Sequence, residues 1–190
     1  MNSMNLAILI PSLIVAALVL WLIALFNALI RIRNRVQEAY SDIDVQLKRR
    51  YDLIPNLVET VQGYMKHEQK TLQAVTEART IAMRAEEAPT RARAENMLTE
   101  TLKSLFAVAE NYPDLKASTN FAKLQDELSD TENKVQAARR FYNGQVRDFN
   151  TKIQSFPNNL VAQTLTFKEY AYFEVAGEKE RENVKVSFPQ

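Results

Sequence analysis

An uncharged run near the N-terminus, Leu6–Ile30, constrains this chain more than any other feature of its sequence. The run is interrupted only by Pro11, Ser12 and Asn27. A helix of this length crosses the ~30 Å hydrocarbon layer of a bilayer with some tilt. The sequence therefore predicts a transmembrane helix, with residues 1–30 forming an anchor.

A cleaved signal peptide is the alternative explanation of the same run. Such a peptide needs a basic start, a shorter apolar core and a cleavage site of small residues. Residues 1–5 carry no charge, and the stretch ALFNALIRIR offers no convincing cleavage site. An uncleaved anchor is therefore favoured.

The first charged residues of the chain predict its orientation. Arg31, Arg33 and Arg35 follow the run directly, and every Asp, Glu, Lys and Arg of the chain lies after residue 30. Basic residues next to a span favour the cytoplasmic side. We therefore expect a single-pass protein of the cell inner membrane, with the N-terminus outside in the periplasm, the bulk of the chain cytoplasmic, and these three arginines at the membrane surface.

Composition narrows the classes of function. The net charge is +1, which gives no basic surface of the kind that nucleic acid requires. The chain has no cysteine and only three glycines, so thiol chemistry and a glycine-rich phosphate loop are both excluded. We expect no nucleic-acid partner, and the low glycine content argues against most nucleotide-dependent enzymes.

Beyond the anchor, apolar or aromatic residues recur every three or four positions, which is typical of a coiled-coil seam with one stutter. The seam residues are Val36, Tyr40, Ile43, Leu47, Tyr51, Ile54, Val58, Val61 and Met65. The seam crosses Pro55 in phase, so we expect Pro55 to kink this helix rather than to end it. The alternative is a helix that stops at Asp52, with Pro55 opening another.

Three more helices are expected, at about 68–85, 91–111 and 121–156, separated by EAPT (87–90) and by Tyr112-Pro113-Asp114. Two long helices then bracket two short ones. If the chain reverses near Gly63–Gln69, residues 31–156 form an antiparallel up-and-down four-helix bundle with a stalk next to the membrane. Met65 and Leu72 are also a heptad apart, so a helix that simply runs on is the alternative.

The C-terminal extension, 157–190, changes period. From Leu165 to Val175, apolar and polar residues largely alternate, and Val184, Val186 and Phe188 alternate again. This pattern predicts a β-hairpin added to an otherwise all-α fold. An isolated hairpin is marginal in water, so it should dock on the bundle or on another copy.

Charges beside the seam suggest how the two long helices pair. If antiparallel partners have residue numbers that add up to about 180, opposite charges meet in every pair. The pairs are Asp42 with Arg139, Arg49 with Glu132, and Arg35 with Asp148, and Arg140 is a second candidate partner for Asp42. Such pairs fix register more than they add stability. The alternative is that they are ordinary solvated surface charges.

The chain lacks the residues of common catalytic and metal sites. His67 is its only histidine and residue 64 is Tyr, so the Glu-x-x-His pairs of di-iron bundles are absent. Asp42 and Asp44 lie two residues apart and face different sides of a helix. A triad would need a histidine base in addition to a nucleophile. We therefore predict no catalytic, cofactor-binding or metal-binding residues.

Four long motifs carry a resemblance to a known family. They are RNRVQEAYSDIDVQLKRRYDLIPNLVETV from Arg33, ENYPDLKA from Glu110, DTENKVQAARRFYN from Asp130 and FNTKIQSFP from Phe149. With these motifs the chain resembles the LemA family of bacterial membrane proteins over nearly all of its length. The resemblance implies an N-out single-span protein with a cytoplasmic four-helix bundle and no established catalytic activity. A relative that helps to shape magnetosome membranes is its main functional hint.

Two hypotheses of function follow from these features. The first is a non-enzymatic, homo-oligomeric inner-membrane scaffold that organises or remodels the lipid bilayer. The second is a membrane-tethered adaptor for a protein partner such as a protease or an envelope-stress component. Large detergent-stable rings would favour the first, and a monomer or dimer with one stoichiometric partner would favour the second.

Overall fold

A computed structural model describes residues 3–174, with side chains from residue 9 onward. All regular structure in these residues is helical. The elements are α1 (Ser3–Gln62), α2 (Gln69–Arg84), α3 (Ala88–Ala109), α4 (Pro113–Lys116), α5 (Thr119–Gln154) and α6 (Asn158–Thr164). They form two compact units: unit 1 combines the chain up to Asp44 with Ala137–Ala171, and unit 2 combines Val45–Gln136 with residues 172–174.

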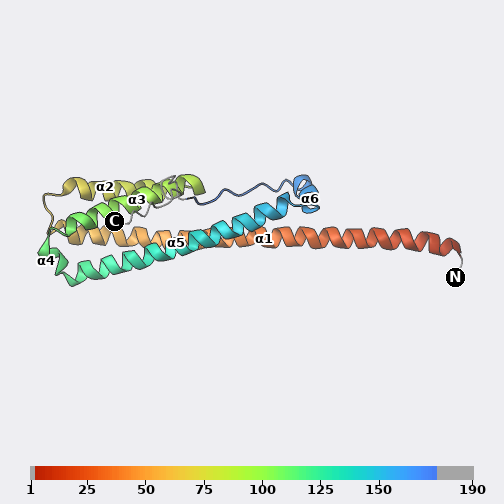
Figure 1. Ribbon diagram of the computed structural model, residues 1–190, viewed down its shortest axis with the longest axis horizontal. Helices are drawn as coiled ribbons and strands as arrows, with labels where there is room; N and C mark the ends of the chain where they lie inside the picture. The colour runs from red at the N-terminus through yellow and green to blue at the C-terminus, as the bar shows by residue number, and fades with distance from the viewer. Residues whose placement is uncertain (1–2, 175–190) are drawn as a thin grey trace, which may run out of the picture. The chain divides into compact units, whose positions relative to one another are not determined.

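Unit 2 is an up-and-down four-helix arrangement. Within it, the end of α1, then α2, α3 and the start of α5 run in alternating directions (Figure 1). The chain reverses between Gln62 and Gln69, as predicted, so the alternative of one helix running on is wrong. Apolar residues recur every three or four positions along the two short helices, and all of these are buried: Leu72, Val75, Ala78, Ala82, Leu98, Leu102, Leu105 and Ala109.

Local sequence explains where the helices of unit 2 begin. α3 starts at Ala88 with Pro89 in its first turn, where a missing backbone N–H costs nothing. The start therefore falls inside the predicted turn EAPT. Pro113 in the same way opens α4, whose Leu115 is buried. The hydroxyl of Ser118 then accepts the backbone N–H of Phe121 at 3.5 Å and caps α5.

Unit 1 packs the first part of α1 against the second part of α5, with α6 at the end of α5 (Figure 1). Its buried apolar residues are Leu25, Leu29, Val36, Ala39 and Ile43 from α1, Tyr142, Val146, Phe149 and Ile153 from α5, and Ala162 from α6. The rings of Tyr40 and Tyr142 meet edge to face at 5.4 Å. Burial, followed by the neighbouring Tyr40 and Tyr170, raises the pKa of Tyr142 to about 12.

The predicted β-hairpin is wrong. Among the described residues, the first predicted strand is replaced by a turn at 165–166 and by residues 167–174, which form no strand. Val184, Val186 and Phe188, the second predicted strand, lie outside the described residues. In residues 167–170 burial repeats every third residue rather than every second: Phe167 and Tyr170 are half-buried, and the two residues between them are exposed.

Side chains of α5 take the place of a partner strand. The amide of Asn150 donates to the carbonyl of Tyr170 at 2.9 Å and accepts its backbone N–H at 3.0 Å. The hydroxyl of Tyr142 donates to the carbonyl of Ala171 at 2.9 Å. Backbone groups must find partners when they are buried, and here helix side chains supply them. The apolar residues of the segment can therefore pack without a second strand.

A left-handed residue ends α6. The N–H of Phe167 donates to Ala162 and that of Thr166 to Gln163, which is the Schellman pattern of bonds. Thr166 has φ of 55°, a conformation that favours glycine and is strained for a β-branched residue. The tight turn sends the chain back along α5.

Replacing Thr166 with glycine should stabilise the protein by about 1 kcal/mol, because it removes the strain of a left-handed threonine. The matched control is Thr164→Gly, which places the same substitution at the last residue of α6 and should cost about 0.3 kcal/mol. Thermal unfolding of the detergent-solubilised protein measures both. Equal destabilisation by the two variants would contradict the assigned turn.

Candidate functional site

The most concentrated chemistry of the described chain is a buried ionic cluster in unit 2. The guanidinium of Arg50 on α1 contacts a Glu95 carboxylate oxygen on α3 at 3.0 Å. It also donates to the hydroxyl of Thr99 at 2.8 Å and lies 2.9 Å from a carboxylate oxygen of Glu132 on α5. Arg50 and Glu95 are 2% and 0% exposed. One cation therefore joins three helices in the interior.

Tyr51 adds a second contact from α1 to the same carboxylate. Its hydroxyl donates to the other oxygen of Glu95 in a short hydrogen bond. Burial, and after it the charge and hydrogen bond of Glu95, raise the pKa of Tyr51 far above its usual value, while Arg91 opposes the rise. Tyr51 is therefore a stable donor in this cluster at any physiological pH.

The remaining helix of unit 2 is joined through a backbone carbonyl. α1 runs through Pro55 without ending, so the alternative of a helix that stops at Asp52 is wrong; the kink itself stays a prediction. Because proline has no N–H, the carbonyl of Tyr51, four residues earlier, loses its helical partner. The Nε of Arg79 on α2 donates to that carbonyl at 2.8 Å. Pro55 thus creates an acceptor that α2 uses.

The cluster has charged and hydroxyl groups of the kinds that catalytic sites use, but its central ions, Arg50 and Glu95, are buried. A cleft of about 600 Å³ between α1 and α2 is lined by Val58, Leu72, Thr76, Glu77 and glutamines, away from Arg50. No group of three or more His, Asp or Glu in the described residues could hold a metal ion. The cluster is arranged to hold helices together.

The predicted charge pairs are placed differently from the expectation. Glu132 pairs with Arg50 rather than with Arg49, which is exposed. The hydrogen bond from Lys134 lowers the pKa of Asp130, and the charges of Lys134 and Arg49 add to this effect. Side chains of consecutive residues on a helix point about 100° apart. Arg49 can therefore be exposed while Arg50, the next residue, is buried.

The other pairs belong to unit 1. Arg139 is buried, whereas Asp42 and Arg140 are both exposed. Asp42 and its first predicted partner, Arg139, therefore lie in different environments. Whether Asp42 couples to either arginine stays a prediction. Arg35 is exposed, and the ion pair of Asp148 is with Arg147 at 3.5 Å.

The antiparallel register itself is close to the predicted one. In unit 1, Tyr40 and Tyr142 meet, and in unit 2, Arg50 and Glu132 meet; each pair of numbers adds up to 182, against the expected value of about 180. Phe149 and Arg33, which also add up to 182, line one cleft of unit 1. The spacing of the seam thus predicted the level of the partners, and missed the rotation of the side chains.

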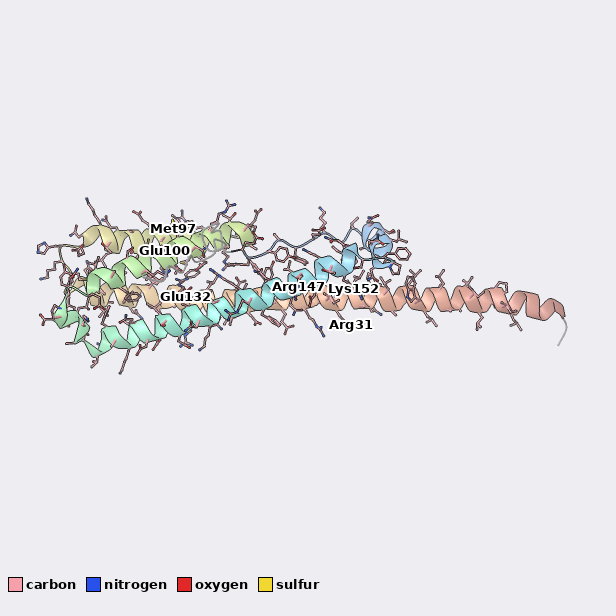
Figure 2. The ribbon with its side chains drawn as sticks, in the orientation of Figure 1. Arg31, Met97, Glu100, Glu132, Arg147 and Lys152 are labelled. Carbon is pink, nitrogen blue, oxygen red and sulfur yellow. The ribbon has the colours of Figure 1, made fainter. Side chains whose placement is uncertain are left out.

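The predicted membrane-surface arginines lie at the start of the charged chain. Arg31, Arg33 and Arg35 are all exposed. In Figure 2, Arg31 and Lys152 of α5 lie at the same level along α1, both in unit 1. The unit 1 cleft, of about 550 Å³, lies between Phe26, Ile30 and Arg33 of α1 and residues 165–170. Basic residues therefore mark one level on both helices.

Sequence reasoning missed the exposed apolar residues beyond Lys152. The predicted helix at about 121–156 included Phe156, but α5 ends at Gln154 and Phe156 is 79% exposed. Leu160 on α6 and Leu165 after it are also exposed. Pro157, directly after Phe156, is the residue that sets the end of the predicted helix, and the exposure of Phe156 was not predicted.

Comparison with known proteins identifies the family. The LemA family matches residues 39–188. The chain belongs to the LemA family. Protein LemA of Metamycoplasma hominis is 33% identical over 162 residues, covering 85% of this chain and 74% of that protein. The match includes the α1 segment that carries Arg50, Tyr51 and Pro55.

More distant relatives carry another name. Magnetosome protein MamQ 2 of Paramagnetospirillum magneticum is 22% identical over 186 residues, covering 84% of this chain and 68% of that protein. Magnetosome protein MamQ of Magnetospirillum gryphiswaldense is 21% identical, with 83% and 67% covered. Among the described residues, one helix, α1, is long and apolar enough to cross a membrane.

Arg50→Met should lower the free energy of unfolding by about 3–5 kcal/mol, because it leaves two carboxylates without their buried cation. The matched control is Arg49→Met, one residue earlier and exposed, which should change stability by no more than about 0.5 kcal/mol. Chemical denaturation followed by circular dichroism measures both. If the two variants cost the same, the assigned rotation of α1 is wrong.

Arg79→Met should cost about 1–3 kcal/mol, because it leaves the Tyr51 carbonyl without a donor. In a Pro55→Ala background the restored N–H can occupy that carbonyl, so the cost of Arg79→Met should fall. A double-mutant cycle on unfolding free energies gives the coupling. Additive effects of the two substitutions would show that Arg79 does not act through this carbonyl.

Proposed function

We propose that this protein is a non-enzymatic scaffold of the bacterial inner membrane, which assembles with copies of itself to organise or curve the bilayer. The observation that carries the proposal is the continuity of α1. The same helix contains the apolar run and contributes Val36, Ala39 and Ile43 to the core of unit 1. A span that is also a core helix holds its folded unit at the bilayer instead of trailing it on a linker.

The charge step supports an orientation with the N-terminus in the periplasm. Arg31, Arg33 and Arg35 are exposed directly after the apolar run, where they can meet anionic lipid headgroups on the cytoplasmic side. The relationship to proteins named for the magnetosome agrees with a role at a membrane.

Exposed apolar side chains support self-association. Within unit 2, Ile81 and Met83 on α2 are 50% and 53% exposed, and Met97 on α3 is 40% exposed. Apolar residues and methionine are favoured in the cores of protein interfaces. A second copy of the chain is the partner that a scaffold requires.

The full chain, extracted in mild detergent, should run as a large homo-oligomer and show rings by electron microscopy. Ile81→Ser combined with Met97→Ser should reduce the size of the assembly, because it removes apolar contact area. The matched control is Glu77→Ser, an exposed polar position on α2, which should leave the size unchanged. Mass photometry and microscopy give the readout.

A monomer or dimer that holds one other protein at fixed stoichiometry would instead support the adaptor function. The orientation is measured in the same cells with reporters fused after Gln190. A cytoplasmic reporter should be active there, and activity of a periplasmic reporter would contradict the proposed topology.

A further inference from the structure

The antiparallel register of unit 1 carries the end of α5 past the charge step on α1. With partner numbers that add up to 182, Lys152 comes level with Ile30, and Phe156 comes level with Phe26. The cleft confirms this overlap, because it places Leu165 and Phe167 opposite Phe26 and Ile30. The chain around α6 therefore lies beside the last two turns of the apolar run.

The α6 end of unit 1 exposes large apolar side chains at this level. Phe156, Leu160 and Leu165 are 79%, 57% and 44% exposed. We call these three residues the α6 apolar tip. Within this short segment, each of the three side chains leaves apolar surface in contact with solvent. The free-energy cost of such exposure is about 25 cal/mol per Å². Ile153 and Ala162 of the same region are buried, so the segment separates an inner apolar face from an outer one.

Simple lengths place the tip at the bilayer boundary. The run Leu6–Ile30 is roughly 37 Å long as a helix, about 7 Å longer than the hydrocarbon layer. The excess corresponds to about five residues, so Phe26–Ile30 lie in the interfacial layer when the run starts at the opposite boundary. The tip lies beside these residues. Leu25 and Leu29 are already covered by protein at this level, with 8% and 0% exposure.

We propose that the α6 apolar tip inserts into the interfacial layer of the same bilayer that α1 spans. The lipid is chosen over a second copy because the tip continues the apolar surface of the span itself. The neighbouring polar groups suit a headgroup environment: Lys152 and Lys168 are cationic, and Asn158, Asn159 and Gln163 are uncharged and polar. The proposal rests on the membrane anchoring in the proposed function, and is independent of self-assembly.

Single-cysteine labelling of the full-length protein in liposomes tests the proposal. The chain has no cysteine, so each introduced thiol reports one position. Phe156→Cys and Leu160→Cys, labelled with an environment-sensitive fluorophore, should lose most of their fluorescence to nitroxide lipids labelled at the headgroup. Both should be protected from aqueous iodide. Because both side chains are exposed, the substitutions leave the core of unit 1 intact.

The matched control is Phe141→Cys, which replaces a phenylalanine of α5 that is 53% exposed and lies about 20 Å before the end of that helix at Gln154. Its label should be quenched by iodide and not by the nitroxide lipids. Val19→Cys, in the apolar run, reports the anchor and should respond to nitroxides in the acyl chains.

The outcomes separate the two proposals. If the labels at 156 and 160 behave like the label at 141 while the label at 19 meets lipid, the anchor stands and the inserted tip is wrong. If the tip labels are shielded from both quenchers, protein covers them and a second copy replaces lipid as the occupant. If the label at 19 also meets only water, the membrane anchoring fails and the inserted tip fails with it.

Discussion

Arg50 cannot enter the interior of unit 2 without anionic partners, because a guanidinium keeps its charge at any pH at which proteins fold. Glu95 from α3 and Glu132 from α5 supply them. A buried ion pair adds little net stability, but a missing partner costs several kcal/mol, so only arrangements that bring both carboxylates to Arg50 are tolerated. The cluster therefore fixes the rotation and the level of three helices.

Pro55 extends the same constraint to the fourth helix. Pro55 has no N–H to donate to the carbonyl of Tyr51, so this carbonyl needs a donor from outside α1. Arg79 is that donor and comes from α2. Tyr51 thus contributes its hydroxyl to α3 and its carbonyl to α2 from one position. A residue that usually breaks helices serves here to attach a neighbouring helix.

The heptad spacing predicted most of the helical core, because burial on a helix repeats with the same period as the sequence pattern. The positions of charged residues in the sequence predicted less about which side chains are buried. Arg49 and Arg50 stand side by side in the sequence, and only packing decides which one turns inward. Glu95 follows a stretch of alanines and arginines, RARA, in which a glutamate would be expected at the surface. Its burial depends on Arg50 from another helix.

The strand prediction failed for a related reason. Alternation of apolar and polar residues predicts which side chains can share a face, but a strand also needs backbone partners. Asn150 and Tyr142 satisfy the backbone near Tyr170 with their side chains. Once α5 provides both the apolar surface and the hydrogen bonds, a second strand is no longer required at this place. No pattern within residues 165–175 could reveal those two donors.

The register of unit 1 has a consequence for how α1 meets a bilayer. A tether would expose the whole circumference of its apolar run to lipid up to the first arginine. Here α5 extends beyond that level, and Leu25 and Leu29 are covered by protein although they belong to the apolar run. In the proposed membrane-spanning arrangement, one side of the helix would thus leave the lipid earlier than the other sides. The boundary between protein and lipid would then be set by where α5 ends and α6 turns back, as well as by Arg31.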